Sequence, residues 1–361
     1  MTSTPRRGGP PSKEVLELSR KGDQFLKQQR YEDAEDAFMK ALAVDRENPY
    51  VLVGLGDLYR QTKEFHRSID FYSRVLATDP ANIFALRGIG DSYRGLNQPS
   101  KAIGYWERYL THNPDDYRVM TRLGDAHKRL KRFAESESYY KQSISLNSTN
   151  SYALMGIGDL YFKWQRYDQA LEFFDRLLAI DGSFVNILTM AGNICRWKKE
   201  YARAKGYYER TLRIEPENVY AVVGMADCAR GENACAEAIG WWSKALKREP
   251  DNQMLLSRIG DAHLNLGELS QAEACFTRSL EIGFDPWALL GMSRLRRAQG
   301  QHQAAIDACG QILQRLPQHA RALEEIVNAL VESGDEARAR EYQARLGALR
   351  PEAPEQPESL P

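Results

Sequence analysis

A glycine returns at one constant interval through most of the chain, and this interval limits the possible folds more than any other feature. We number the glycine as position 8 of a repeating unit. The residues at position 8 are Gly22, Gly56, Gly90, Gly124, Gly158, Gly192, Ala226 and Gly260. A period of about 34 residues predicts tandem copies of one supersecondary unit. Such an array can use all 361 residues, which are too many for one ordinary compact domain.

Two further positions keep the same interval. Position 20 holds a small residue: Ala34, Ser68, Ala102, Ser136, Ala170, Ala204, Ala238 and Ala272. Position 24 holds an aromatic residue: Phe38, Tyr72, Trp106, Tyr140, Phe174, Tyr208, Trp242 and Phe276. Small residues allow two helices to approach closely, and the aromatic residue fills the space between one unit and the next. A bulky residue at position 8 is therefore expected to overpack the core.

This register, with prolines closing units at Pro80, Pro114, Pro216 and Pro250, resembles the tetratricopeptide repeat family over nearly the whole chain. The resemblance implies an all-α, right-handed α-solenoid superhelix with two antiparallel helices per repeat. We expect the array to span residues 12–353, with nine clear repeats from Val15 and a degenerate capping repeat at 320–353. Segments 1–11 and 354–361, the latter rich in Pro and Glu, are expected to be disordered.

Composition argues against several classes of function. The 49 basic residues balance 49 acidic ones, so no charge excess favours nucleic acid. The N-terminus has no apolar leader and no apolar run is long enough to span a membrane, which predicts a cytoplasmic protein without membrane insertion. The five cysteines form no CxxC pair, the histidines form no HxxxH pair, and His127 and His263 take a core position. We expect no metal, no cofactor and no catalytic site.

An acidic residue follows most of the position-8 residues. These position-9 residues are Asp57, Asp91, Asp125, Asp159, Asn193 and Asp227. A basic residue stands three residues later, at Arg60, Arg94, Lys128, Arg196 and Arg230. An aromatic residue stands seven residues before, at Tyr50, Phe84, Tyr152 and Tyr220. In the resembled family this helix lines the concave groove, so these residues are the candidate site for a peptide or protein partner.

Two interpretations of this pattern stay open. We call the acidic residues at position 9 and the basic residues three positions later the ladder. Acidic and basic residues at this spacing form surface ion pairs worth about 0.2–0.5 kcal/mol each. In the first interpretation the ladder braces the array and has no other role, and the aromatic residues seal the joins between repeats. Alternatively, the ladder offers hydrogen-bond partners to an extended peptide and the aromatic residues receive its side chains. The acidic ladder is similar in plan to the asparagine ladder of O-linked N-acetylglucosamine transferases. It is expected to prefer ligands that carry Lys, Arg or a free amine.

The carboxylate clamp of chaperone adaptors is not expected. Arg118 and Arg122 resemble one pair of clamp residues, but Asp57 and Asp91 stand where the clamp has asparagine. The predicted function is thus a non-catalytic protein-interaction scaffold that binds a partner of unknown identity in its groove. The alternatives are a self-associating homodimer and a regulatory subunit of an enzyme or secretion assembly.

Overall fold

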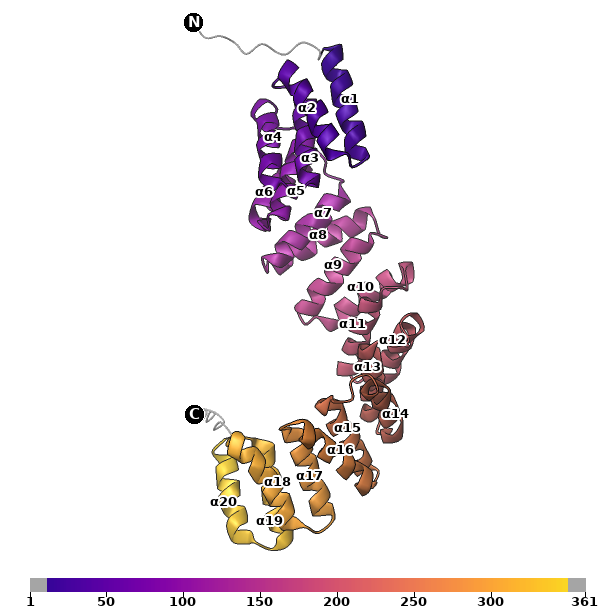
Figure 1. Ribbon diagram of the computed structural model, residues 1–361, viewed down its shortest axis with the longest axis vertical. Coiled ribbons are helices and arrows are strands. Elements are labelled where there is room, and N and C mark those ends of the chain that lie inside the picture. Colours follow the sequence, from indigo (N-terminus) through magenta and orange to yellow (C-terminus); the bar gives the residue numbers. More distant parts are fainter. Residues whose placement is uncertain (1–11, 350–361) are drawn as a thin grey trace, which may run out of the picture. The chain divides into compact units, whose positions relative to one another are not determined.

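The computed structural model describes residues 12–349 and forms helices there with no strand. Twenty helices follow one another as ten antiparallel pairs (Figure 1). The first helices of the pairs are α1 (Lys13–Lys27), α3 (Pro49–Gln61), α5 (Ile83–Gly95), α7 (Tyr117–Arg129), α9 (Ser151–Lys163), α11 (Val185–Trp197), α13 (Val219–Gly231), α15 (Gln253–Asn265), α17 (Pro286–Ala298) and α19 (Ala320–Ser333).

The second helices are α2 (Tyr31–Val44), α4 (Phe65–Thr78), α6 (Pro99–Leu110), α8 (Phe133–Leu146), α10 (Tyr167–Ile180), α12 (Tyr201–Ile214), α14 (Cys235–Leu246), α16 (Leu269–Ile282), α18 (His302–Arg315) and α20 (Glu336–Gly347). The prediction of an all-α solenoid built from tandem helical pairs is confirmed. The predicted terminal segments 1–11 and 354–361 lie outside the described residues.

The chain divides after Gly182 into two compact units. The first unit contains α1–α10 and the second contains α11–α20. Within each unit, each helix packs on the next along the chain, which is the expected arrangement of a solenoid whose repeats contact mainly their neighbours.

Local sequence sets the ends of the helices. Asparagine or aspartate caps several first helices; the Asn82 side chain, for example, accepts a hydrogen bond from the Ala85 backbone N–H at 3.1 Å. The turn inside each pair contains a residue in the left-handed region. That residue is Lys63 or Asn97 in two early repeats and Gly267 in a later one, with φ of 65°, 56° and 77°. Only glycine takes this conformation without steric cost, so the early repeats retain some strain in their turns.

The position-24 ring explains why glycine recurs. The Phe38 ring lies between Gly22 of its own repeat and Gly54 of the next one, and an added Cβ would approach the ring to 2.6 Å and 2.5 Å respectively. Gly124 and Gly156 enclose the Tyr140 ring in the same way. The GxG pairs such as Gly54 and Gly56 are therefore two packing positions, 6 and 8, that touch two different rings.

The residue at position 6 also varies with the kind of joint between repeats. Where it is glycine, as at Gly54, Gly88, Gly156, Gly224 and Gly291, the first helices of neighbouring repeats pack against each other. Two joints carry arginine instead: Arg122 on α7 follows Trp106, and Arg258 on α15 follows Trp242. At these joints the first helices, α5 with α7 and α13 with α15, make at most marginal contact within the described residues.

Candidate functional site

All of the candidate residues lie on first helices, and the position-9 residues accept hydrogen bonds from inside the array. The Tyr72 hydroxyl donates to Asp57 at 2.9 Å, and the Tyr208 hydroxyl donates to Asn193 at 2.8 Å. Burial raises the pKa of Tyr208 to about 12, so this hydroxyl keeps its proton and remains a donor. Tyrosine at position 24 thus joins the two helices of a pair through the position-9 side chain.

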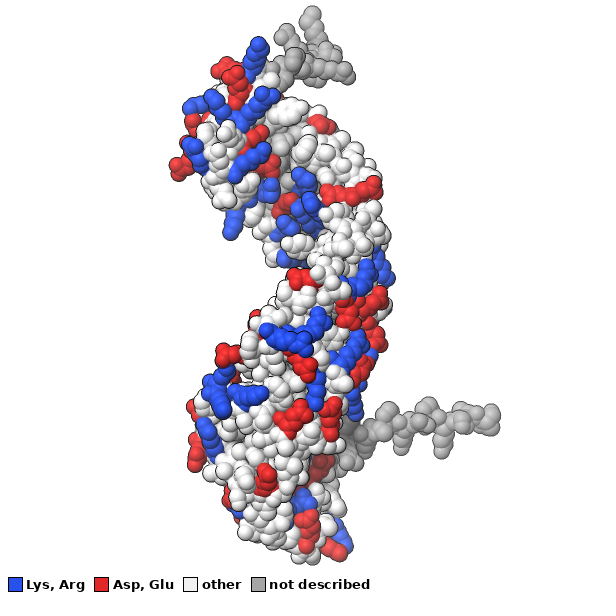
Figure 2. Space-filling view, turned by 90° about the vertical axis from the view of Figure 1, so that its right-hand side faces the viewer, with Lys and Arg blue, Asp and Glu red and all other residues white. Residues whose placement is uncertain are grey.

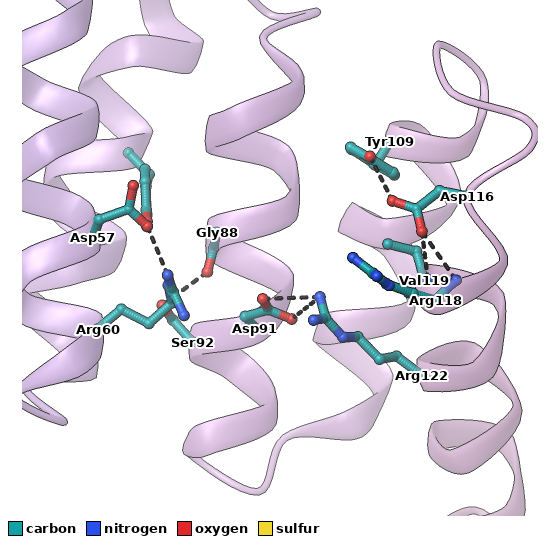
Figure 3. A network of polar contacts seen from close by, with 11 residues as sticks. Asp57, Arg60, Gly88, Asp91, Ser92, Tyr109, Asp116, Arg118, Val119 and Arg122 are labelled. Atoms are coloured by element: carbon teal, nitrogen blue, oxygen red, sulfur yellow. Dashed lines mark hydrogen bonds and ion pairs between the residues drawn. The ribbon is translucent and has the colours of Figure 1, made fainter. Parts of the chain in front are cut away.

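The arginines at position 6 bind the position-9 residue of the preceding repeat. One guanidinium nitrogen of Arg122 lies 2.8 Å and 3.0 Å from the two carboxylate oxygens of Asp91 (Figure 3). In the second unit Arg258 lies 2.8 Å from Asp227, whose other oxygen is 3.1 Å from Arg196. Asp227 is almost fully buried, so these two guanidinium groups compensate a charge that would otherwise be costly.

The expected pairing within one helix forms in only part of the ladder. Arg60 lies 2.7 Å from Asp57, and Lys128 lies 3.7 Å from Asp125. Lys128 also reaches Asp159 of the next repeat at 3.0 Å. Burial alone would raise the pKa of the Asp159 carboxyl, but Lys128 and Lys163 outweigh burial and lower that pKa. Most of the ladder is therefore engaged in contacts that brace the array.

The sequence interpretation misses the ion-pairing role of position 6. It matches Arg122 only to a clamp residue and does not single out Arg258. A signal is present, because these arginines replace the glycine found at position 6 in Gly54 and Gly88. The ion-pairing role is difficult to recognise from the sequence because the paired residues are 31 positions apart and lie on two different helices.

The candidate aromatic residues are exposed and do not seal the joins. The exposed fraction of the residue is 70% for Tyr50, 56% for Phe84, 81% for Tyr152 and 77% for Tyr220. Aromatic side chains are usually buried because their transfer from water is favourable. All four occupy the same position of their repeats, position 2, on the first helices α3, α5, α9 and α13.

One cavity of the first unit is lined by charged side chains that are mainly basic. It measures about 740 Å³ and its charged lining residues are Arg60, Lys63, Arg94, Arg122, Lys128, Arg129, Lys163, Asp91, Asp125 and Asp159. Basic residues outnumber acidic ones here, so the expected preference for cationic ligands does not fit this cavity. On the face shown in Figure 2, basic and acidic side chains are interspersed rather than gathered into one large field of a single sign.

The described residues also bear on metal binding and on membrane crossing. Among residues 12–349, no group of three His, Cys, Asp or Glu side chains is placed to hold a metal ion. Over the same residues, no helix has the length and apolar character needed to cross a membrane.

A family model described as tetratricopeptide repeat matches residues 19–83, 87–151, 132–183 and 290–354, which is more than half of the chain. A second model with the same description matches residues 255–282. No curated protein matches the chain.

Several solved structures are similar to the chain. The C-terminal part of a TPR repeat-containing protein from Cytophaga hutchinsonii is 16% identical, with a TM-score of 0.59 over 67% of this chain and 99% of that one. PilF of Pseudomonas aeruginosa is 20% identical, with a TM-score of 0.49 over 58% of this chain and 95% of that one. A tetratricopeptide repeat protein from Parabacteroides merdae is 15% identical, with a TM-score of 0.47 over 73% and 98% of the two chains. At these identities the likeness concerns the fold alone.

Proposed function

Because the chain belongs to the tetratricopeptide repeat family, we propose that it is a non-catalytic scaffold that binds a peptide or protein segment along the first helices of its repeats. The partner contacts the exposed aromatic side chains at position 2, seven residues before position 9, and the position-9 residues hold the helices that present them. The five cysteines form no disulfide within the described residues, which is in keeping with a cytoplasmic protein.

The exposed aromatic residues carry this proposal. Tyr152 and Tyr220 are the most exposed large apolar side chains among the described residues, and they occupy the same position of two repeats in different units. A tyrosine offers a large apolar area and a polar tip at low conformational cost, which suits an interface. Bracing alone gives no reason to keep such rings in water.

The ladder supports binding indirectly. The carboxylates of Asp57, Asp91 and Asp227 are held by tyrosine or arginine partners of the array. The pairs that join Asp91 and Asp227 to arginines of the following repeat hold neighbouring repeats together and thereby set the spacing of the aromatic side chains. The bracing interpretation and the binding interpretation are therefore compatible, because the ladder braces the array and the aromatic residues bind the partner.

The proposal is tested with variants that remove exposed area without touching the core. The full chain, Tyr152→Ser and Tyr220→Ser are used to capture proteins from a lysate of the source cell, and captured proteins are identified by mass spectrometry. Met39→Ser is the matched control, because Met39 is also an exposed apolar side chain but lies on a second helix. Circular dichroism verifies that every variant keeps its helicity.

We expect one partner to be captured by the full chain and by Met39→Ser, and to be lost or weakened in the tyrosine variants. Equal capture by all the proteins would contradict binding along the first helices. Capture of the same chain as its own partner would favour the homodimer, and capture of an enzyme or a secretion assembly would favour the regulatory subunit.

A further inference from the structure

Two stretches of the chain are related at an interval of four repeat lengths. AIGYW at 102–106 corresponds to AIGWW at 238–242, and TRLGDAH at 121–127 corresponds to SRIGDAH at 257–263. The same interval relates Asp91 to Asp227 and Arg94 to Arg230. The first stretch lies in the first unit and the second stretch in the second unit. Each unit thus contains one copy of the joint at which arginine replaces glycine.

Each copy borders a cavity of similar size and equivalent lining. The cavity of the first unit measures about 500 Å³ and that of the second unit about 570 Å³. Five lining positions correspond in order along the chain: Arg94 and Arg230, Thr121 and Ser257, Arg122 and Arg258, Asp125 and Asp261, Tyr152 and Trp287. Such agreement is not expected of two unrelated surface hollows.

Each cavity contains an arginine that is bound to a carboxylate of the preceding repeat and another that pairs with no carboxylate of the described residues. Arg122 is bound to Asp91, and Arg258 is bound to Asp227. Arg94 and Arg230 are exposed, and among residues 12–349 no ion pair joins either of them to a carboxylate. Each cavity therefore presents a free guanidinium group, the side chain best suited to bind a carboxylate with two hydrogen bonds.

An exposed aromatic side chain lies at the edge of each cavity. Tyr152 is 81% exposed and Trp287 is 51% exposed. An apolar side chain can pack on Tyr152, or on the part of the Trp287 ring that the Arg321 guanidinium, 5.0 Å from its centre, leaves uncovered, while a neighbouring carboxylate meets the arginine. The combination selects a ligand with an acidic and an apolar group close together.

The charge of both cavities is positive overall. Three arginines and one aspartate line the first cavity, while four arginines and three carboxylates line the second. Burial lowers the pKa of Arg122, Asp91 offsets part of this effect, and the nearby charges of Arg94 and Arg87 lower the pKa further. A carboxylate from a partner would relieve this repulsion between like charges in the first cavity.

We propose that the chain is bivalent, and that each unit binds one acidic segment of a partner protein, with a carboxylate on Arg94 or Arg230 and an apolar side chain on Tyr152 or Trp287. This inference rests on the proposed function and adds to it the number of sites and the chemistry of the ligand. One chain can then hold two partner copies, or two segments of one partner with increased avidity.

The two sites are related but not identical. Arg118 in the first cavity corresponds to Met254 in the second, and Glu324 and Glu325 are found only in the second. The first site therefore has the higher positive charge. Its affinity for an acidic segment is expected to fall more steeply as salt concentration rises, because salt screens exposed charges.

The test is a calorimetric titration of the full chain with a synthetic peptide of alternating Glu and Ser that contains one Phe. A peptide with Lys in place of Glu and a single-stranded oligonucleotide are titrated for comparison. The protein variants are Arg94→Glu, Arg230→Glu and the double variant. Arg213→Glu is the matched control, because it makes the same charge change on the second helix α12, at a side chain that is 76% exposed.

We expect two acidic peptides to bind per chain, one per chain in each single variant, and none in the double variant. Each single variant should weaken its own site by roughly tenfold or more. The control should bind as the unchanged chain does, and the Lys peptide should not bind.

A stoichiometry of one in the unchanged chain would overturn bivalence. If Arg213→Glu weakened peptide binding as much as the site variants do, the assignment of Arg94 and Arg230 as the binding residues would be overturned. If the Lys peptide or the oligonucleotide bound more tightly than the acidic peptide, the assignment of an acidic segment as the ligand would be overturned. If a peptide with the sequence of residues 351–361 bound more tightly than the Glu/Ser peptide, the ligand would be the chain's own C-terminal segment. The assignment of the acidic segment to a partner protein would then be overturned. If these titrations fail while Tyr152→Ser still loses its captured partner, the proposed function stands without this inference. If capture is also unaffected, both fail.

Discussion

At the scale of single residues, the recurring glycines act through the side chain that they lack. Gly156 and Gly124 both lie against the Tyr140 ring, where an added methyl group would meet ring carbons at less than the usual contact distance. Gly104, by contrast, lies inside α6 with no atom within 4 Å of an added Cβ. The same residue type is thus required in one place and tolerated in another.

Gly156→Ala and Gly104→Ala should change stability in opposite directions. The first places a Cβ 2.6 Å from the Tyr140 ring, and overpacking of this kind costs roughly 1–3 kcal/mol. The second removes the helix penalty of glycine and should stabilise the first unit by about 0.5–1 kcal/mol. Urea unfolding followed by circular dichroism measures both. Destabilisation of similar size in both variants would contradict the packing account.

His127 should make the first unit less stable in acid. The ring is 5% exposed, stacks on Tyr139 and has no hydrogen-bond partner for either nitrogen in the described residues, and burial lowers its pKa from 6.5. The unfolded chain therefore takes up a proton first as pH falls below about 6.5, and the free energy of unfolding decreases from that pH downward.

The check is His127→Phe, which keeps an aromatic ring but cannot bind a proton. Urea unfolding of both proteins is compared at about pH 7.5 and about pH 5.5, above and below the pKa of a free histidine. The loss of stability between these pH values should be smaller in the variant. An equal loss in both proteins would show that other groups cause it.

Much at this scale could be read from the sequence. The constant interval of the glycines identified position 8 and position 24 as packing partners, and it placed His127 in the core. The exposure of Tyr152 and Tyr220 could not be read, because an aromatic residue at the start of a helix can seal a join or face water equally well. Whether the aromatic side chain is buried or exposed depends on the orientation of the neighbouring helix in the folded array.

At the scale of helices and joints, position 6 differs between joints where first helices pack together and the two joints where they hardly touch. Glycine at position 6 lets first helices pack together, as in α7 and α9, whereas Arg122 and Arg258 accompany joints with little contact between first helices. The ion pair to the preceding repeat replaces that contact. Spacing along one helix predicted the Asp57–Arg60 pair, but it could not predict pairs between residues on helices that meet only in the folded array.

Asp91→Ala should loosen one joint and leave the others intact. The Asp91 side chain is 9% exposed, and its loss leaves the Arg122 guanidinium without its carboxylate, at a cost of roughly 1–3 kcal/mol. Since repeats couple mainly to their neighbours, amide hydrogen exchange should rise in α5 and α7 and stay unchanged in α19.

Asp251→Ala is the control for that experiment. Its side chain is 82% exposed and lies 3.9 Å from Arg278, so the change should stay within about 0.5 kcal/mol. Faster exchange throughout the first unit of Asp91→Ala, rather than at one joint, would contradict the nearest-neighbour account.

At the scale of the whole molecule, the chain consists of two units that repeat one design of cavity. The net charge of zero conceals local excess, because basic residues outnumber acidic ones around Arg94 while the chain as a whole is balanced. The fold class could be predicted from the shared register of the glycines, small residues, aromatic residues and prolines. The relation over four repeat lengths was also in the sequence, but the stronger interval of a single repeat masked it, and only the equivalent cavities show why it matters.

The most direct test of binding along the first helices is site-specific photocrosslinking in the source cell. A photoreactive phenylalanine derivative replaces Tyr152, Tyr220 or Met39 in the full chain, and crosslinked products are identified by mass spectrometry. The account predicts that the same partner is crosslinked from positions 152 and 220 and not from position 39. A partner crosslinked from position 39 but from neither tyrosine position would contradict it.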